Sequence, residues 1–127
     1  MKRLLLACFL LTATCATTNV MAQGTTTTQT PKATFVATFN QMDQHLLNNQ
    51  VNLAKQDFES MKPMFISNFA VGKSAIHSET NPTTKASLLN TYTQKQNIYT
   101  QIIHLAQDLA ANRVAIMAKF NEYADLY

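Results

Sequence analysis

The sequence is poor in glycine, proline and cysteine, and it has no tryptophan. With only 2 glycines among its 127 residues, it offers no glycine-rich loop of the kind that holds phosphate groups. It also contains neither the G-x-S-x-G nor the S-x-x-K arrangement of nucleophilic enzymes. We therefore expect a protein that is not an enzyme and that uses no cofactor.

The N-terminal segment has the layout of a secretory signal. Residues 1–3 supply positive charge, residues 4–11 are an apolar stretch too short to span a bilayer, and residues 20–22 (Val-Met-Ala) resemble a cleavage site. We expect residues 1–22 to be a signal peptide, so that the protein is exported to the periplasm or secreted.

Both cysteines, Cys8 and Cys15, lie within this segment. The mature chain would then have no disulfide and no thiolate metal site, and apolar burial would have to stabilise it. The alternative is a lipoprotein anchored through Cys15, although the Thr-Ala-Thr before that cysteine is a poor lipobox.

Removal of the segment also lowers the net charge. The whole chain has 10 lysines and arginines against 7 acidic residues, and the loss of Lys2 and Arg3 leaves 8 against 7. A net charge of +1 gives no reason to expect binding to nucleic acid or to an anionic membrane. No later stretch is long and apolar enough to predict a transmembrane helix.

Two dipeptides mark helix starts. Thr30-Pro31 and Asn81-Pro82 each place a capping side chain before a proline, and proline is well tolerated in the first turn of a helix. Residues 23–30 are rich in threonine and have no apolar anchor, so we expect a disordered leader there.

The segment from 82 to 126 has the strongest helical pattern. Its apolar residues recur at alternating steps of three and four, and no glycine or proline interrupts residues 83–127. This pattern predicts one helix of about 44 residues, roughly 65 Å long.

Residues 31–47 and 50–77 carry two further apolar stripes, which are out of phase with each other. The phase changes at Asn48 and Asn49, whose side chains compete with helical hydrogen bonds, so we place a tight turn there. The alternative is one continuous helix over residues 31–78, which would make the fold a long two-helix hairpin.

The predicted fold is thus an all-α antiparallel three-helix bundle, one domain over residues 31–127, with a single long C-terminal helix. Pro63 lies inside the second helix, where it should kink or restart it. Lys95 and Arg113 fall in the apolar stripe of the third helix and need polar partners or an exit to solvent. An antiparallel register places Arg113 near Asn48, where it would donate to the free carbonyls that end helix one; the alternative is an extended side chain in solvent.

The same register leaves the far end of helices two and three uncovered, because the short helix one reaches only to about residue 62. Beyond that point apolar side chains face several directions. Such a patch predicts self-association or partner binding, and the alternative is simple core packing. The residues of this candidate interface are Met64, Phe65, Ile66, Phe69, Val71, Ile76, Leu89 and Tyr92.

Metal binding is a weaker alternative. His104 and Asp108 are four residues apart on one helical face, the spacing of a ligand pair, but no third ligand is evident. Met61 and Met64 suggest soft ligands for Cu(I), although methionine more often fills a core.

The sequence therefore predicts an exported, non-enzymatic helical protein that acts in the cell envelope through contact with a protein partner or with copies of itself. The alternative is a periplasmic chaperone or apolar-ligand-binding protein that uses the same patch. The repeated Leu-Thr-x-x-Gln motif of one helical periplasmic chaperone family is absent.

Overall fold

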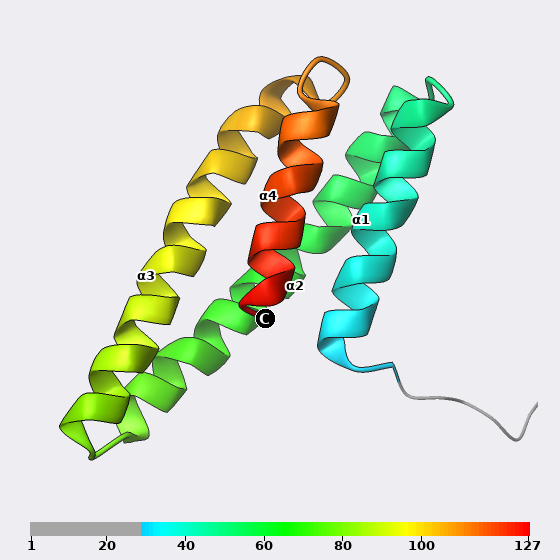
Figure 1. Cartoon of the computed structure of the whole chain (residues 1–127). Coiled ribbons are helices and arrows are strands. Elements are labelled where there is room, and N and C mark those ends of the chain that lie inside the picture. The colour runs from blue at the N-terminus through cyan, green and yellow to red at the C-terminus, as the bar shows by residue number, and fades with distance from the viewer. Residues whose placement is uncertain (1–28) are drawn as a thin grey trace, which may run out of the picture.

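A computed structural model describes residues 29–127, and the expected signal peptide (1–22) and most of the expected leader (23–30) lie outside this range. The described residues form an all-α bundle, as predicted from the helical periodicity (Figure 1). Its elements are α1 (Pro31–Leu47), α2 (Val51–Ser78), α3 (Pro82–Leu105), a one-turn 3-10 helix η2 (Ala106–Asp108) and α4 (Arg113–Asp125). None of the helices in this range combines the length and apolar character needed to cross a bilayer.

Both predicted helix starts are confirmed. The Thr30 hydroxyl accepts a hydrogen bond from the Ala33 amide at 3.2 Å, and Pro31 opens α1. The Asn81 side chain accepts from the amides of Thr83 and Thr84 at 3.0 and 3.1 Å, and Pro82 opens α3. In each case the capping side chain satisfies amides that the helix itself leaves unpaired.

The predicted turn between α1 and α2 is also present. Asn49 has a φ of 57°, a left-handed conformation that asparagine tolerates better than most residues. The Asn49 amide donates to the Leu46 carbonyl and the Gln50 amide donates to the His45 carbonyl, at 3.1 and 2.7 Å. This pair of bonds is a Schellman motif, which ends α1 and excludes the alternative of one continuous helix.

Pro63 does not restart α2, which is assigned as helix without a break from residue 51 to 78. Its ring lies on the exposed side of the helix. Water can therefore reach the carbonyl left without an amide partner, and the buried neighbours Met61 and Phe65 hold the helix on both sides.

The long helix predicted from residue 82 is confirmed as far as residue 108, but its predicted continuation to residue 126 is wrong, so residues 29–127 form four α-helices where three were predicted. The chain leaves the α-helix at Ala106 and re-enters an α-helix at Arg113, and α4 returns beside α3 toward α1. The Asp108 carboxylate accepts from the Ala111 amide, and the Asn112 side-chain amide donates to the Leu105 carbonyl, both at 3.0 Å. These side chains replace helical backbone bonds, and the reversal lets α4 bury apolar residues that a straight rod would leave exposed.

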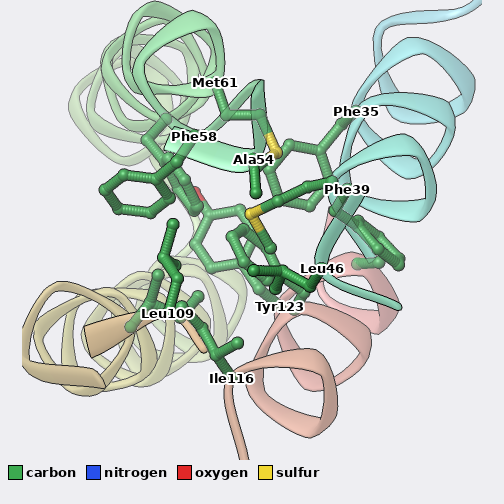
Figure 2. Close-up of a cluster of buried hydrophobic side chains, with 14 residues drawn as sticks. Phe35, Phe39, Leu46, Ala54, Phe58, Met61, Leu109, Ile116 and Tyr123 are labelled. Carbon is green, nitrogen blue, oxygen red and sulfur yellow. The ribbon is translucent and has the colours of Figure 1, made fainter. Parts of the chain in front are cut away.

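The core lies where all four helices meet. Phe35 and Phe39 on α1 and Phe65 on α2 pack against Phe120 and Tyr123 on α4. Figure 2 shows part of this cluster, with Phe35, Phe39 and Tyr123 among its labelled side chains. The ring centroids of Phe65 and Tyr123 are 4.7 Å apart, in an edge-to-face arrangement. Because α4 contributes its residues to this cluster, the reversal after α3 completes the core.

Arg113 closes the bundle between its first and last helices. Its Nε donates to Asp43 Oδ1 at 2.7 Å and its Nη2 donates to Asp43 Oδ2 at 3.1 Å. The predicted location, near the end of helix one, is close to the observed one, but the partner is a carboxylate and not the backbone carbonyls beside Asn48. The paired geometry is the one that a guanidinium forms best with a carboxylate.

Candidate functional site

The far ends of α2 and α3 form a two-helix projection, residues 66–94, which we call the arm. It extends past the N-terminal end of α1 and the C-terminal end of α4 (Figure 1). No residue of the arm is fully buried, whereas Phe65, directly before it on α2, and Ile102, beyond it on α3, are. Along most of the arm, α2 and α3 therefore pack only against each other.

One line of contacts holds the two helices of the arm together. The Phe69 and Tyr92 rings meet edge to face with centroids 5.6 Å apart, and Phe69 also contacts Tyr99 at 5.6 Å. A Cβ atom on Gly72 would lie 3.1 Å from the Tyr92 ring. Glycine at that position lets the tyrosine pack closely against the α2 backbone.

The predicted interface residues divide into three groups. Phe65 is 0% exposed and belongs to the core, so its assignment to a surface patch is wrong. Met64, Phe69, Ile76 and Tyr92 are half-buried. Ile66, Val71 and Leu89 are 67%, 66% and 53% exposed, and they are the members that a partner can reach.

These three exposed residues do not form one patch. Along α2, Lys62, Ile66, Lys73 and His77 recur at steps of four, seven and four, so they share one side of the helix. Val71 lies five residues from Ile66, on another side. On α3, Leu89 shares its side with Lys85, Gln96 and Ile103 by the same rule.

Two open hollows lie between α2 and α3. The nearer hollow, about 460 Å³, is lined by Lys55, Phe58, Glu59, Lys62, Ile103, Ala106, Gln107 and Leu109. The hollow on the arm, about 580 Å³, is lined by Ala70, Lys73, Ser74, Ile76, His77 and Lys85. Ile66 shares the side of α2 that carries Lys62 and Lys73, and Leu89 shares the side of α3 that carries Lys85 and Ile103, so both lie between the two hollows along their helices.

We call these two hollows, together with the sides of α2 and α3 that lie between them, the basic groove. It consists of Lys55, Lys62, Ile66, Lys73 and His77 of α2 and Lys85, Leu89 and Ile103 of α3. Of the acidic residues that the structure describes, only Glu59 lines either hollow, and it pairs with Lys62 at 2.6 Å. The groove therefore has excess positive charge, although residues 29–127 together carry 8 lysines and arginines against 7 acidic residues.

A group of polar side chains lies where the arm joins the rest of the bundle. We call that part, in which α1 and α4 pack against α2 and α3, the four-helix half. Asn68 Oδ1 accepts from Lys95 Nζ at 2.9 Å and from the Tyr123 hydroxyl at 3.0 Å. Burial lowers the pKa of the Lys95 ammonium group and raises the pKa of the Tyr123 hydroxyl. Lys95 thus finds the polar partner that its position in the apolar stripe requires.

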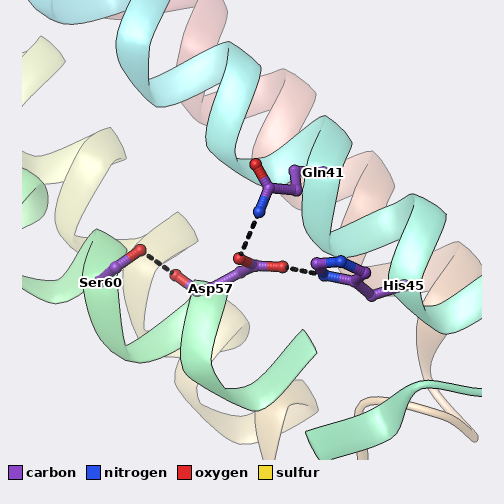
Figure 3. Close-up of polar contacts among 4 residues, drawn as sticks. All are labelled: Gln41, His45, Asp57 and Ser60. Atoms are coloured by element: carbon purple, nitrogen blue, oxygen red, sulfur yellow. Dashed lines mark hydrogen bonds and ion pairs between the residues drawn. The ribbon is translucent and has the colours of Figure 1, made fainter. Parts of the chain in front are cut away.

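A second polar cluster ties α1 to α2 in the four-helix half (Figure 3). His45 Nδ1 lies 2.5 Å from Asp57 Oδ2, and Gln41 donates to Asp57 Oδ1 at 3.1 Å. The Ser60 hydroxyl donates to the main-chain carbonyl of Asp57, so it is not bonded to the imidazole. The geometry is that of a bridge between helices, and the serine is not placed as a nucleophile activated by His45.

The residues suggested for metal binding are not brought together. Within residues 29–127, no three His, Cys, Asp or Glu side chains are placed to hold an ion. The Asp108 carboxylate bonds the Ala111 amide, and His104 is exposed. Met61 is fully buried in the core, where it serves as packing.

The lysines of the basic groove were not identified as site residues from the sequence. A signal was present, because Lys62, Ile66 and Lys73 follow helical spacing and Lys85 and Leu89 do so on the next helix. The net charge of the chain does not reveal it, because six of the seven acidic residues lie outside both hollows, among them Asp43 and Glu122, which pair with Arg113 and Lys119. Comparison with known proteins adds no candidate, as no family model, curated protein or solved structure matches this chain.

Proposed function

We propose that this chain is an exported, non-enzymatic binding protein of the cell envelope that contacts a protein partner through the arm. The observation that carries the proposal is the arm itself, which presents Ile66 and Leu89 to solvent while the rest of the described chain leaves them uncovered. The proposal of export rests on the signal-like pattern of residues 1–22.

The separation of the buried core in the four-helix half from the exposed arm supports a binding role. The four-helix half contains every fully buried side chain of the described residues, so it can stabilise the fold without help from the arm. In the arm, the contact between the Phe69 and Tyr92 rings holds α2 against α3. Exposed aliphatic side chains on a supported surface favour association, at roughly 25 cal/mol per Å² of apolar area covered.

The hollows favour a polypeptide over a small apolar ligand. Both are open, and lysines line both. A small apolar ligand would instead need an enclosed cavity with few charged groups. For this reason we prefer a protein partner to the apolar-ligand alternative.

Site-specific photo-crosslinking in expressing cells tests the proposal. A photoreactive residue at position 66 or 89 should give one adduct of defined mass with the same protein, identified by mass spectrometry. The matched control is position 114, where Val114 is 77% exposed but lies on α4. Equal adducts at all three positions, or none at 66 and 89, would contradict the proposal.

Light scattering of the purified mature chain over a concentration series distinguishes self-association from binding to a different protein. We expect a monomer at all concentrations. A stable dimer that Ile66→Glu dissociates would assign the arm to self-association instead. A monomer that binds a hydrophobic dye through the arm, and that crosslinks to many different proteins, would favour the chaperone alternative.

A further inference from the structure

The structure points to the chemistry of the partner: we infer that the basic groove takes an acidic, amphipathic segment of a protein. This inference rests on the proposed function, because it specifies what the arm and the adjoining part of α2 and α3 recognise. It is carried by the combination of lysines and exposed aliphatic side chains along one groove.

The charges lie on both sides of the groove. Lys55 and Lys73 extend from α2, and Lys85 extends from α3. Among the ion pairs of the described residues, none involves these three lysines. Carboxylates of a bound segment would therefore meet cations that have no competing partner within the described fold.

Aliphatic side chains lie between these charges. Ile66 lies between Lys62 and Lys73 along α2, Leu89 lies between Lys85 and Ile103 along α3, and Ile103, 36% exposed, lines the nearer hollow. A segment with apolar residues on one side and acidic residues at its edges would cover the aliphatic groups and pair with the lysines together. A purely acidic ligand would leave the aliphatic groups uncovered.

The length of the groove sets the size of the segment. Lys55 and His77 are 22 positions apart on one helix, which corresponds to roughly 33 Å. A helix of about 20 residues or an extended strand of about 10 would span it. The hollows at the two ends would accept the larger side chains of such a segment.

Other occupants match the groove less well. Two copies of this chain that met groove to groove would bring lysines against lysines, which opposes association. Nucleic acid would leave Ile66 and Leu89 in contact with a polar backbone, and the groove presents no exposed Phe or Tyr ring for base stacking. An anionic bilayer is flat, whereas the two hollows lie between helices.

A synthetic peptide gives a direct test, because the chain has no tryptophan and a tryptophan in the peptide reports binding without background. The probe is an amphipathic peptide of about 20 residues with leucines on one face, glutamates at its edges and one tryptophan. We expect saturable binding to the mature chain that weakens as salt is added. A peptide with lysine in place of every glutamate should not bind.

Matched variants connect the binding to the groove. Lys73→Gln with Lys85→Gln should weaken the peptide affinity about tenfold, as expected for the loss of two partly exposed ion pairs. The control, Lys32→Gln with Lys119→Gln, removes the same charge from α1 and α4 and should change the affinity less than about twofold. Circular dichroism verifies that both variants are folded.

Each contrary result is informative. No binding of the glutamate peptide, equal loss in both variants, or lysine-dependent binding of vesicles containing phosphatidylglycerol or of a single-stranded oligonucleotide in preference to the peptide would overturn the inference. The proposed function would then still stand if positions 66 and 89 crosslink to one protein. Peptide binding without such a crosslink would instead contradict the proposed function and leave the chemistry of the groove established.

Discussion

The same two helices behave differently in the two halves of the molecule. In the four-helix half, α2 buries Phe58, Met61 and Phe65, because α1 packs along it and the rings of Phe120 and Tyr123 on α4 cover it. In the arm, α2 continues with Ile66, Phe69 and Val71, yet none of these becomes fully buried. Apolar content is similar in both stretches, so burial depends on how many helices surround a residue and not on its type.

Substitution of the adjacent residues Phe65 and Ile66 should give the largest difference in stability between the two halves. Phe65→Ala should reduce the free energy of unfolding by about 3–5 kcal/mol, because it removes a ring that contacts Phe35, Tyr99 and Tyr123. Ile66→Ala, its neighbour, should change it by less than about 0.5 kcal/mol. Urea unfolding followed by circular dichroism measures both. Equal losses would mean that the arm side of α2 is covered in solution.

Alkaline pH should weaken the four-helix half through Tyr123. Burial, reinforced by the nearby Tyr127 and Tyr99, raises the pKa of its hydroxyl, so the folded protein keeps a proton that the unfolded chain loses near pH 10. This contribution to stability is complete below about pH 10 and is lost as the pH rises further. Lys95, whose pKa burial lowers, acts in the opposite direction: stability increases from its lowered pKa up to its usual value of 10.5.

Tyr123→Phe separates these effects. The variant loses the bond to Asn68, which lowers stability at every pH, but its decline above about pH 10 should be shallower by up to about 1.4 kcal/mol per pH unit, the value for one proton. Urea unfolding between about pH 9 and pH 12 tests this. An unchanged slope would show that Tyr123 does not carry the alkaline sensitivity.

The ion pair of Asp43 and Arg113, which joins α1 to α4, should have a smaller effect on stability. A double-mutant cycle of Asp43→Ala and Arg113→Ala should give a coupling of about 1 kcal/mol, since the two-bond geometry is favourable but the side chains are partly exposed. The same cycle on the exposed pair of Lys62 and Glu59 serves as the control, with about 0.3 kcal/mol expected. Equal couplings would contradict a special role for Arg113.

The smallest expected change concerns the packing of the arm. Gly72→Ala removes a helix-weakening residue, which favours stability by about 0.5–1 kcal/mol, but the new methyl group approaches the Tyr92 ring to 3.1 Å. In an arm with one layer of packing the half-buried ring can shift by a few tenths of an ångström. We therefore expect a net gain of up to about 0.5 kcal/mol in thermal or urea unfolding. A loss above about 1 kcal/mol would show that the arm is packed as rigidly as the core.

The helix caps and the turn between α1 and α2 could be predicted from the sequence. Thr30, Asn81 and the Asn48-Asn49 pair act on backbone groups within a few residues, so their role as caps and turn follows from residue type alone. The all-α class followed from periodicity for the same reason.

The reversal of the chain after α3 could not be predicted from the sequence, and the wrong assignment of Phe65 follows from this. Leu109 is buried inside the turn and keeps the three-four spacing intact, so the pattern of a continuous helix continues through it. A straight helix three could not cover Phe65, so the sequence pattern assigns Phe65 to an exposed patch. In the structure α4 returns and covers it with Phe120 and Tyr123.

The lysines of the basic groove required the tertiary arrangement. Their spacing on each helix was visible, but only the packing of α2 on α3 places Lys73 and Lys85 around one hollow. The net charge is an average over the chain, and it says nothing about a surface where one sign is collected.

The contact between Asp43 and Arg113 also has a consequence for the order of folding. The other pairs of neighbouring helices are hairpins with short connections, so their contacts close small loops, whereas these two residues are 70 positions apart. We expect this closure to form late, after the transition state, so that Arg113→Ala accelerates unfolding and leaves the refolding rate almost unchanged in stopped-flow experiments. The contacts between α1 and α4, this ion pair among them, would then slow unfolding, while the helical hairpins determine how quickly the fold forms.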